Sequence, residues 1–209
     1  MTLHDYWRST SSYRLRIALA LKGLSPERAP VHLVRGEQRE PAYLGLNPQG
    51  RVPTLVLDDG AVLTQSPAIV EYLEEVHPAP PLLPADPLAR ARARAVAAIV
   101  GCDVHPLHNV AVLAHLRGPL GRPEEEVSAW IARWIGDGFA AIEALIGDEG
   151  YCFGPEPGLA DLYLVPQLYA ARRFGVPLDV YRRILRVEAL AAEHPAFAAA
   201  HPSQQPDAA

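Results

Sequence analysis

The sequence predicts two parts of different fold class: an α/β domain over residues 1–81 and an all-α domain over residues 82–209. Three observations predict this division. Short apolar strand patterns alternate with helical patterns up to about residue 76. A proline-dense stretch, 77–87, then interrupts the chain as a linker does. Beyond it, apolar residues recur almost everywhere at helical spacing.

The first strand and the first helix are joined by a short stretch rich in hydroxyl groups. The strand is expected over 2–7, the helix over 13–23, and the hydroxyls lie in 8–12. Main-chain N–H groups at a helix N-terminus lack intrahelical partners and the helix dipole is positive there, so this stretch favours an anion such as a thiolate. The simpler interpretation, favoured on local grounds, is that Ser11 or Ser12 caps the helix.

The rest of the first domain alternates in the same way. The further elements expected are a strand, one or two helical turns, a hairpin of two strands and a closing helix, over 29–34, 41–46, 52–57, 61–63 and 67–76. The strand at 29–34 is expected to be parallel to the first, because a helix crosses between them. The resulting order, β-α-β-α-β-β-α, is the layout of a thioredoxin-like domain.

Pro53 is unusual at the start of a predicted strand, because proline cannot donate to the hydrogen-bond ladder. A cis Val52–Pro53 peptide would form a tight turn and expose the main chain of Val52. A trans peptide is the commoner arrangement for an X–Pro bond.

The second domain is expected to consist of long helices. The first, over about 88–116, contains Pro106, which should kink or divide it. The next helix begins at Pro123, followed by three glutamates that suit a helix N-terminus. That helix is expected to end near Gly147. Further helices are expected from 158 to about 174, with Asp161 capping the first turn, and over 178–192, before a polar tail at 203–206.

Composition excludes several classes of protein. A formal net charge of −5 argues against general nucleic-acid binding. The two cysteines, Cys102 and Cys152, form neither a disulfide framework nor a metal-binding spacing. The N-terminal residues lack the apolar core of a signal peptide, and no apolar run is judged long enough to span a membrane. The cytoplasm is therefore the expected location.

Several segments resemble one known family. The chain is similar to the glutathione transferases, and among them to the zeta class of maleylacetoacetate isomerases, over 9–12, 14–23, 46–48, 52–55, 65–69, 71–75, 81–84, 160–162, 164–167, 173–174 and 205–207. It is also similar to the glutathione-dependent maleylpyruvate isomerases over 7–9 and 100–106. The resemblance implies the glutathione transferase fold, glutathione as cofactor and a homodimer.

The resemblance also assigns residues to the cofactor. Ser9 is expected to be the main donor to the thiolate, with Thr10 and Ser11 as alternatives, and Ser11 stands where the family has a cysteine. The remaining cofactor contacts would come from Gln65 and Ser66 for the γ-glutamyl carboxylate, from Val52 and Pro53 for the cysteinyl amide, and from Gln38 near the glycyl end. From the local pattern alone, a simple helix cap is the better interpretation of Ser66.

The substrate implied by the resemblance is a small cis-diacid, which calls for arginines that bind carboxylates. Arg8 and Arg173 match that role, although Arg173 also suits a helix C-terminus. His105, His108 and Asn109 are expected to line the substrate pocket near Pro106, and no metal site is expected. Arg8 and Arg173, together with Ser9, Thr10 and Ser11, are the candidate catalytic residues.

The activity implied is the conversion of maleylacetoacetate to fumarylacetoacetate in aromatic amino-acid breakdown, through thiolate addition, bond rotation and elimination. Maleylpyruvate isomerisation is the nearest alternative, although Val110 stands where that branch has an arginine. A broader zeta-class transferase or dehalogenase is another. A catalytically weak glutathione-binding module is the third: the missing cysteine at Ser11 favours it, whereas Arg8 and Arg173 argue against it.

Overall fold

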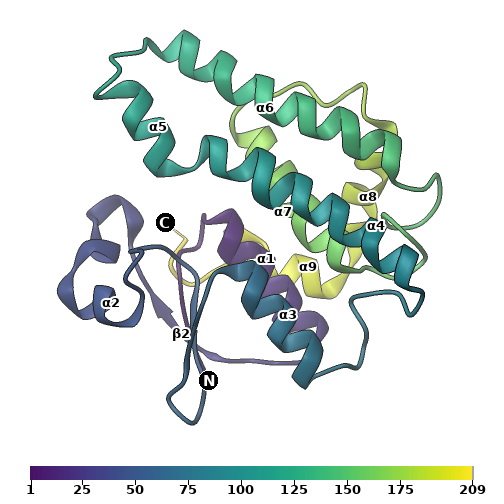
Figure 1. Cartoon of the computed structure of the whole chain (residues 1–209), viewed down its shortest axis with the longest axis horizontal. Coiled ribbons are helices and arrows are strands. Elements are labelled where there is room, and N and C mark those ends of the chain that lie inside the picture. The colour runs from purple at the N-terminus through teal and green to yellow at the C-terminus, as the bar shows by residue number, and fades with distance from the viewer. Residues whose placement is uncertain (209) are drawn as a thin grey trace. The chain divides into compact units, whose positions relative to one another are not determined.

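The chain divides into two compact units in a computed structural model that describes residues 1–208 (Figure 1). The first unit contains Met1–Pro81 and the described residues from Ala192 onward, and the second contains Leu82–Ala191. By chain order, the sequence assigns 192–209 to the helical domain. In the structure, the contacts of 192–208 group them with the α/β unit, because the helix they contain packs on the first helix of that unit.

A mixed four-stranded sheet lies at the centre of the first unit. Its strands are β1 (Thr2–Asp5), β2 (Glu27–Pro30), β3 (Thr54–Val56) and β4 (Val62–Thr64), in the order β2-β1-β3-β4. β1 is parallel to β2, as predicted, and antiparallel to β3, which pairs with β4 as a hairpin. The α/β fold class predicted for this part is therefore confirmed.

The second strand lies earlier in the chain than the sequence predicts. It ends at Pro30, and Leu33–Arg35 forms a 3₁₀ turn (η1) in place of the end of the predicted strand 29–34. The His32 ring accepts a hydrogen bond from the Arg35 N–H at 3.2 Å. This local bond offers the backbone an alternative to the sheet ladder.

Four α-helices accompany the sheet: α1 (Thr10–Leu21), α2 (Pro41–Leu46), α3 (Ser66–Val76) and α9 (Pro195–Ala200). α1 contacts both α3 and α9, and in Figure 1 the yellow α9 lies beside the purple α1. Leu15 and Ile17 of α1 are fully buried. α9 is not predicted, since its six residues are mostly alanine and carry little periodic signal. Two further 3₁₀ turns complete the described part of the unit, η2 (Glu37–Arg39) and η5 (Pro202–Gln204).

Lys22, the only lysine of the chain, joins three segments of the first unit. Its Nζ donates to Glu74 Oε2 on α3 and to the main-chain oxygen of Pro80, both at 2.6 Å. The side chain has no exposed surface. The end of α1 is therefore tied to α3 and to the proline-rich segment that leaves this unit.

The second unit is helical, as predicted. It contains α4 (Pro87–Ala98), α5 (Val110–Arg117), α6 (Glu124–Leu145), α7 (Leu159–Arg173) and most of α8 (Arg182–Glu193). The predicted break at Pro106 is confirmed, because a π-helical turn, η3 (Ile99–Val104), and a 3₁₀ turn, η4 (His105–His108), separate α4 from α5. A proline lacks the N–H of a regular helix and crowds the carbonyl four residues earlier, which explains the irregular turns there.

The start of α7 shows why its cap is a glycine. The carboxylate of Asp161 accepts from the Gly158 N–H at 2.8 Å and from the Cys152 N–H at 2.9 Å, which is the structural role predicted for it. A Cβ on Gly158 would lie 2.9 Å from the main-chain oxygen of Leu82. A serine or threonine cap would therefore displace the chain at Leu82, which also accepts a hydrogen bond from Leu159.

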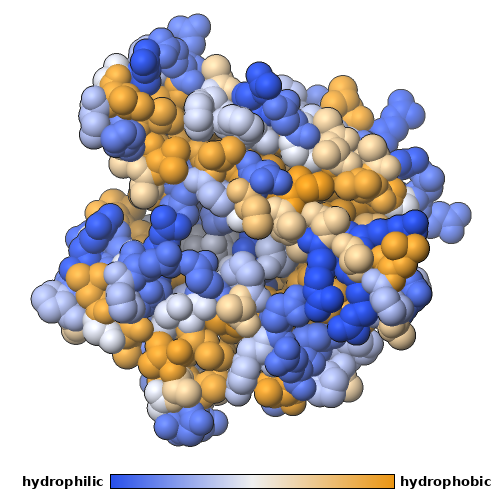
Figure 2. All heavy atoms as spheres, in the orientation of Figure 1, coloured by the Kyte–Doolittle hydropathy of each residue, from blue (hydrophilic) through white to orange (hydrophobic). Residues whose placement is uncertain are grey.

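One helical stretch, Pro87–Arg117, is long and apolar enough to cross a membrane by length and composition alone, contrary to the sequence expectation. This stretch of 31 residues joins α4, η3, η4 and α5, which are taken together as one helical run. One such run is weak evidence, because core helices also meet this criterion. Figure 2 shows apolar and polar side chains interspersed on the face drawn.

Two glycines of α6 give a matched test of packing in the second unit. A Cβ on Gly138 would lie 2.2 Å from Cγ2 of Val104, whereas a Cβ on Gly136 would meet no atom closer than the Tyr181 hydroxyl at 3.8 Å. We expect Gly138→Ala to lower the free energy of unfolding by about 1–3 kcal/mol through overpacking. Gly136→Ala should be neutral or stabilising by up to ~1 kcal/mol, through helix propensity. Urea unfolding followed by circular dichroism measures both, and equal effects would contradict the packing explanation.

Candidate functional site

Ser9 caps α1 at the hydroxyl-rich turn. Its backbone is extended (φ −69°, ψ 123°), and its Oγ accepts from the Ser12 N–H at 3.2 Å. The prediction that Ser11 or Ser12 caps this helix is wrong, because α1 begins at Thr10, upstream of both serines. Since Oγ uses a lone pair for the cap, the hydroxyl proton remains available to a ligand. Ser9 can therefore act as both cap and donor.

The hydroxyls that follow Ser9 lie at three different depths. Thr10 is 6% exposed, Ser11 is half-buried and Ser12 is fully buried. Within residues 1–208, the Ser12 Oγ has no hydrogen-bond partner. Ser9 and Ser11, which are both half-buried, are therefore the more accessible hydroxyls of this turn.

Arg8 immediately precedes the cap residue. Its side chain is half-buried, and the guanidinium carbon lies 5.5 Å from the ring centroid of Trp7, which is a cation–π distance. A guanidinium held against an aromatic ring keeps its fork of N–H donors, so it can still bind a carboxylate.

The start of α3 brings a buried arginine to Ser66. Ser66 is the first residue of α3, not its cap, and it is 3% exposed. Its Oγ accepts from Nη1 of Arg14 on α1 at 2.9 Å. The cap position belongs to Gln65, which has a positive φ of 67° and makes no capping bond with its side chain. A helix N-terminus beside a guanidinium is a favourable place for a carboxylate.

The Val52–Pro53 peptide is cis, so the alternative raised for this bond is the one observed. The predicted strand 52–57 begins only at Thr54, and within residues 1–208 the main chain of Val52 makes no hydrogen bond. The neighbouring carbonyl of Arg51 accepts from Tyr43 Oη at 2.6 Å and from Asn47 Nδ2 at 2.7 Å. The turn is thus held in place, while the Val52 backbone stays open to an extended peptide.

Gln38 is positioned by a close approach of two loops. A Cβ on Gly50, which has a positive φ of 61°, would lie 2.8 Å from the Gln38 main-chain oxygen. Only glycine therefore fits there. Within the described chain, the buried Oε1 of Gln38 has no hydrogen-bond partner. Gln49, next to Gly50, accepts a hydrogen bond from the Gln65 side chain, so these loops also meet the start of α3.

The first unit therefore links the predicted cofactor residues through a chain of contacts. Gln38 meets the 49–50 turn, Gln49 meets Gln65, Ser66 meets Arg14, and Arg14 lies on the helix that Ser9 caps. This arrangement offers a hydroxyl at one helix start, an open backbone edge and a cationic second helix start. A peptide with a thiol and a carboxylate matches these groups.

In the second unit, His108 is a buried, hydrogen-bonded histidine. It is 4% exposed, and its Nε2 lies 2.9 Å from Nε2 and 3.1 Å from Oε1 of the Gln167 amide on α7. Its ring lies 5.6 Å from the ring of Phe174 and 5.4 Å from that of His105. Burial lowers the pKa of His108, and the positive charge of Arg173 lowers it further, whereas the bond to Gln167 raises it.

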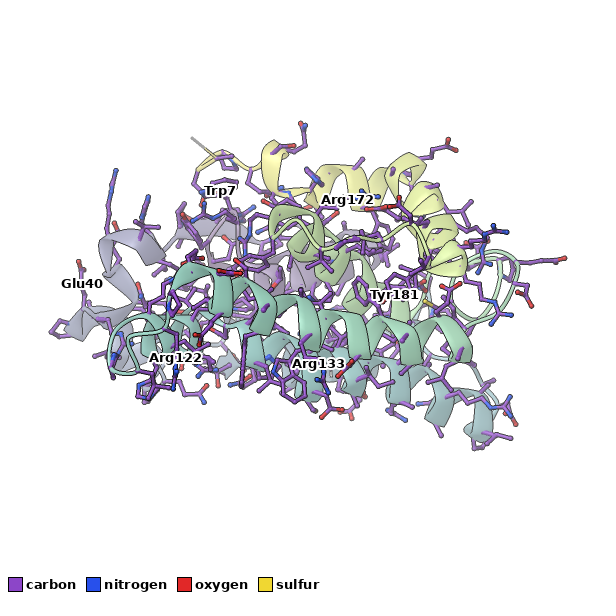
Figure 3. The ribbon with its side chains drawn as sticks, turned by 90° about the horizontal axis from the view of Figure 1, so that it is seen from above. Trp7, Glu40, Arg122, Arg133, Arg172 and Tyr181 are labelled. Carbon is purple, nitrogen blue, oxygen red and sulfur yellow. The ribbon has the colours of Figure 1, made fainter. Side chains whose placement is uncertain are left out.

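Arg173 lies at the exposed end of α7, with its guanidinium carbon 4.6 Å from the ring centroid of Phe174. Arg172, labelled in Figure 3, is held by a bidentate ion pair with Glu188 on α8. Asn109 caps α5 without a capping bond from its side chain. His105, His108 and Arg173 are thus near one another, and among the described residues no three His, Cys, Asp or Glu side chains are placed to hold a metal ion.

Comparisons with known proteins agree with this arrangement. Residues 8–76 match the model of the glutathione S-transferase N-terminal domain, and residues 124–200 match that of the C-terminal domain. A maleylacetoacetate isomerase of Pseudomonas aeruginosa is 65% identical over 209 residues, covering 99% of this chain and 98% of that protein.

Two solved structures are also similar. The holo structure of a maleylpyruvate isomerase, a bacterial glutathione S-transferase of the zeta class, is 50% identical with a TM-score of 0.97, and all of both chains is covered. A maleylacetoacetate isomerase of Anaeromyxobacter dehalogenans 2CP-1, with bound dicarboxyethyl glutathione and citrate in the active site, is 44% identical with a TM-score of 0.89, covering 100% of this chain and 93% of that one. The chain belongs to the zeta class of the glutathione S-transferase family.

Two polar residues of these sites are not singled out by the sequence pattern. Arg14 is buried beside Ser66. In the sequence it looks like any solvent-facing arginine of an amphipathic helix. Gln167 is buried on α7. Its only signal in the sequence is that it is a polar residue among apolar ones in a predicted helix. Both contacts join segments more than 50 residues apart, which local patterns do not show.

The backbone of Gln65 gives a test of strain at this site. Because its φ is positive, a side chain at this position is strained, at a cost of about 1–3 kcal/mol. We expect Gln65→Gly to have a free energy of unfolding roughly 1 kcal/mol higher than Gln65→Ala. Both variants lose the contact with Gln49, so their difference in thermal unfolding isolates the backbone. Equal stability would show that the conformation is unstrained.

His108 gives a pH-dependent prediction. Its pKa in the folded protein is below the ordinary value of 6.5, so its contribution to stability is present above pH 6.5 and is lost as the pH falls through the folded-state pKa. His108→Gln removes this titration. We therefore expect the loss of unfolding free energy between pH 7 and pH 5, measured with urea, to be smaller in the variant than in the wild type. An equal loss in the two proteins would contradict the assignment.

Proposed function

We propose that the protein is a glutathione-dependent cis–trans isomerase that converts maleylacetoacetate to fumarylacetoacetate. The observation that carries this proposal is the start of α1, where a cap serine keeps a hydroxyl proton free to donate at a positive helix end. The same class of protein includes a relative 65% identical that is named maleylacetoacetate isomerase. The reaction belongs to aromatic amino-acid breakdown, and we place the protein in the cytoplasm as a homodimer.

The residues present fit glutathione. The unpartnered Oε1 of Gln38 and the open main chain of Val52 suit the amide groups of a tripeptide. The start of α3, with Gln65, Ser66 and the charge of Arg14, suits its free α-carboxylate. Pro53 follows Val52 and shapes that turn.

When bound, glutathione supplies a thiolate that adds to the cis double bond, allows it to rotate and leaves. The chain's own residues lower the pKa of that thiol. The Ser9 hydroxyl donates a hydrogen bond to the charged form, and the N–H groups at the start of α1 favour negative charge. Thr10 and Ser11 are further donors in the same turn. Ser11 in place of a cysteine is compatible with this chemistry, because the nucleophile is not a protein group.

Arg8 and Arg173 are our candidates for the substrate's carboxylates, since guanidinium groups bind carboxylates with two parallel hydrogen bonds. Asn109, His105 and His108 would offer hydrogen bonds to the substrate, and the pKa of His108 is lowered by burial. A dicarboxyethyl group on glutathione, as in the similar structure, is what a thiolate would form with a four-carbon unsaturated diacid.

Maleylpyruvate is the second candidate substrate, because the similar structure with a TM-score of 0.97 is that of a maleylpyruvate isomerase. A spectrophotometric assay of both cis-diacids, with and without glutathione, tests the proposal. We expect turnover only with glutathione, and a higher kcat/KM for maleylacetoacetate. A higher kcat/KM for maleylpyruvate would reverse the substrate assignment. No turnover of either diacid would leave a glutathione-binding module and overturn the proposed activity.

Substitutions of Ser9 separate its two roles. Ser9→Ala removes the cap and the donor, and should lower the free energy of unfolding by about 1 kcal/mol. Ser9→Gly keeps most of the cap's stability, at a cost of a few tenths of a kcal/mol. We expect both to raise the pKa of the bound thiol and to lower kcat roughly 10²-fold, the order found for loss of one donor to a developing anion. Ultraviolet titration of the bound thiolate measures the pKa. Full activity in Ser9→Gly would show that the hydroxyl is not the donor.

A further inference from the structure

The loop that carries Arg8 and Ser9 depends on contacts from outside itself. It connects the end of β1 to α1, and its one internal backbone bond runs from the Ser9 N–H to the Tyr6 oxygen at 3.0 Å. The N–H and the main-chain oxygen of Trp7 have their partners elsewhere in the first unit, and the Tyr6 oxygen has a second partner there. What holds these groups therefore determines where the Ser9 hydroxyl lies.

The Trp7 N–H is bound by a residue 200 positions away. It donates to Oδ2 of Asp207 at 2.9 Å. Figure 3 shows Trp7 beside the thin yellow segment at the C-terminal end of the chain. The main-chain oxygen of Trp7 accepts from Nη2 of Arg16 at 2.9 Å, and that of Tyr6 from Nη1 at 3.5 Å. Both sides of this peptide segment are therefore anchored by charged side chains.

Asp207 is held by a turn at the end of the chain. The Ala208 N–H donates to the Gln205 main-chain oxygen at 3.0 Å, so residues 205–208 form a turn with Pro206 at its second position. Proline favours that position because its φ is already set. The third position, Asp207, then points its carboxylate to the loop. The polar tail predicted at 203–206 is thus an ordered part of the structure.

Gln205 fastens this turn to the rest of the unit. It is 7% exposed, and its Nε2 donates to the main-chain oxygens of Ala199 at 2.9 Å and His201 at 2.8 Å. Its Oε1 accepts from Nη1 of Arg28. All polar groups of this buried amide side chain are used, which fixes the turn relative to α9 and β2.

Two arginines connect the turn, the loop and the sheet. Arg28 binds Gln205, lies 3.8 Å from Asp207 and donates to Asp5 at 2.6 and 3.0 Å. Arg16 donates to Asp5 at 2.9 Å and to the main-chain oxygen of Ala200 at 3.0 Å. The two positive and two negative side chains balance in charge, so the network is neutral as a whole.

We propose that Asp207 is a positioning residue for the isomerase reaction: its bond to the Trp7 N–H, held by Gln205 and Arg28, sets the place of the Ser9 hydroxyl and of Arg8. This inference rests on the proposed function. Asp207 touches no reacting group itself. Its loss frees the loop, and a displacement of about 1 Å in a catalytic group is enough to lower a rate by roughly 10²-fold.

The test uses full-length variants and two measurements. Hydrogen exchange of residues 6–9, followed by mass spectrometry in the protein without glutathione, reports the loop. The pKa of the bound glutathione thiol, from ultraviolet titration, reports the site. We expect Asp207→Ala to speed exchange of this segment about tenfold or more and to raise the thiol pKa by about one pH unit, because the Ser9 donor is no longer aligned. Asp207→Asn keeps a side-chain oxygen that can accept from the Trp7 N–H, so this variant should retain most of the wild-type exchange protection.

Glu74→Ala is the matched control, because it removes a charged partner in the same unit, at Lys22, without touching the loop. It should lower the melting temperature and leave both exchange at 6–9 and the thiol pKa unchanged. Wild-type values of exchange and thiol pKa in Asp207→Ala would overturn the proposal, and so would faster exchange with an unchanged thiol pKa. If the wild type binds no glutathione, the proposed function fails, whereas the exchange comparison still decides whether the tail orders the loop.

Discussion

The buried carboxylate of Asp5 is the interaction on which the first unit depends. It is fully buried at the end of β1, and its charge is balanced by Arg16 and Arg28. Burial lowers the pKa of Arg16, and the neighbouring Asp5 carboxylate partly offsets that shift. Removing one partner of a buried ion pair costs about 3–5 kcal/mol. The folded first unit therefore needs Asp5 together with its arginine partners. The first loop, the first helix and the end of the chain are all attached to them.

The candidate site depends on the same kind of rigid support. The site uses main-chain groups and helix starts more than reactive side chains: Ser9 at α1, the Val52 backbone, and Ser66 at α3. Such groups work only if the loops that hold them are rigid. Tyr43 and Asn47 fix one loop through the Arg51 carbonyl, and the charged network fixes the other. Catalysis by preorganised donors requires this kind of support.

The sequence predicts the fold class, the parallel pairing of the first strands and the break at Pro106, because each has a local signal. It places the cap of α1 two or three residues too late, since Ser9, Ser11 and Ser12 are equally good caps by residue type. It also misses the role of Asp207. A carboxylate that binds a backbone N–H 200 positions away leaves no local pattern. For the same reason, Arg14 and Gln167 become visible only when the helices are packed.

The burial of Lys22 has a practical consequence for chemical labelling. The chain has no other lysine, and this ammonium is enclosed by Glu74 and the Pro80 carbonyl. Acylating reagents that modify accessible lysines therefore find no target side chain among these residues while the first unit is folded. Modification of Lys22 would instead report that the first unit has opened.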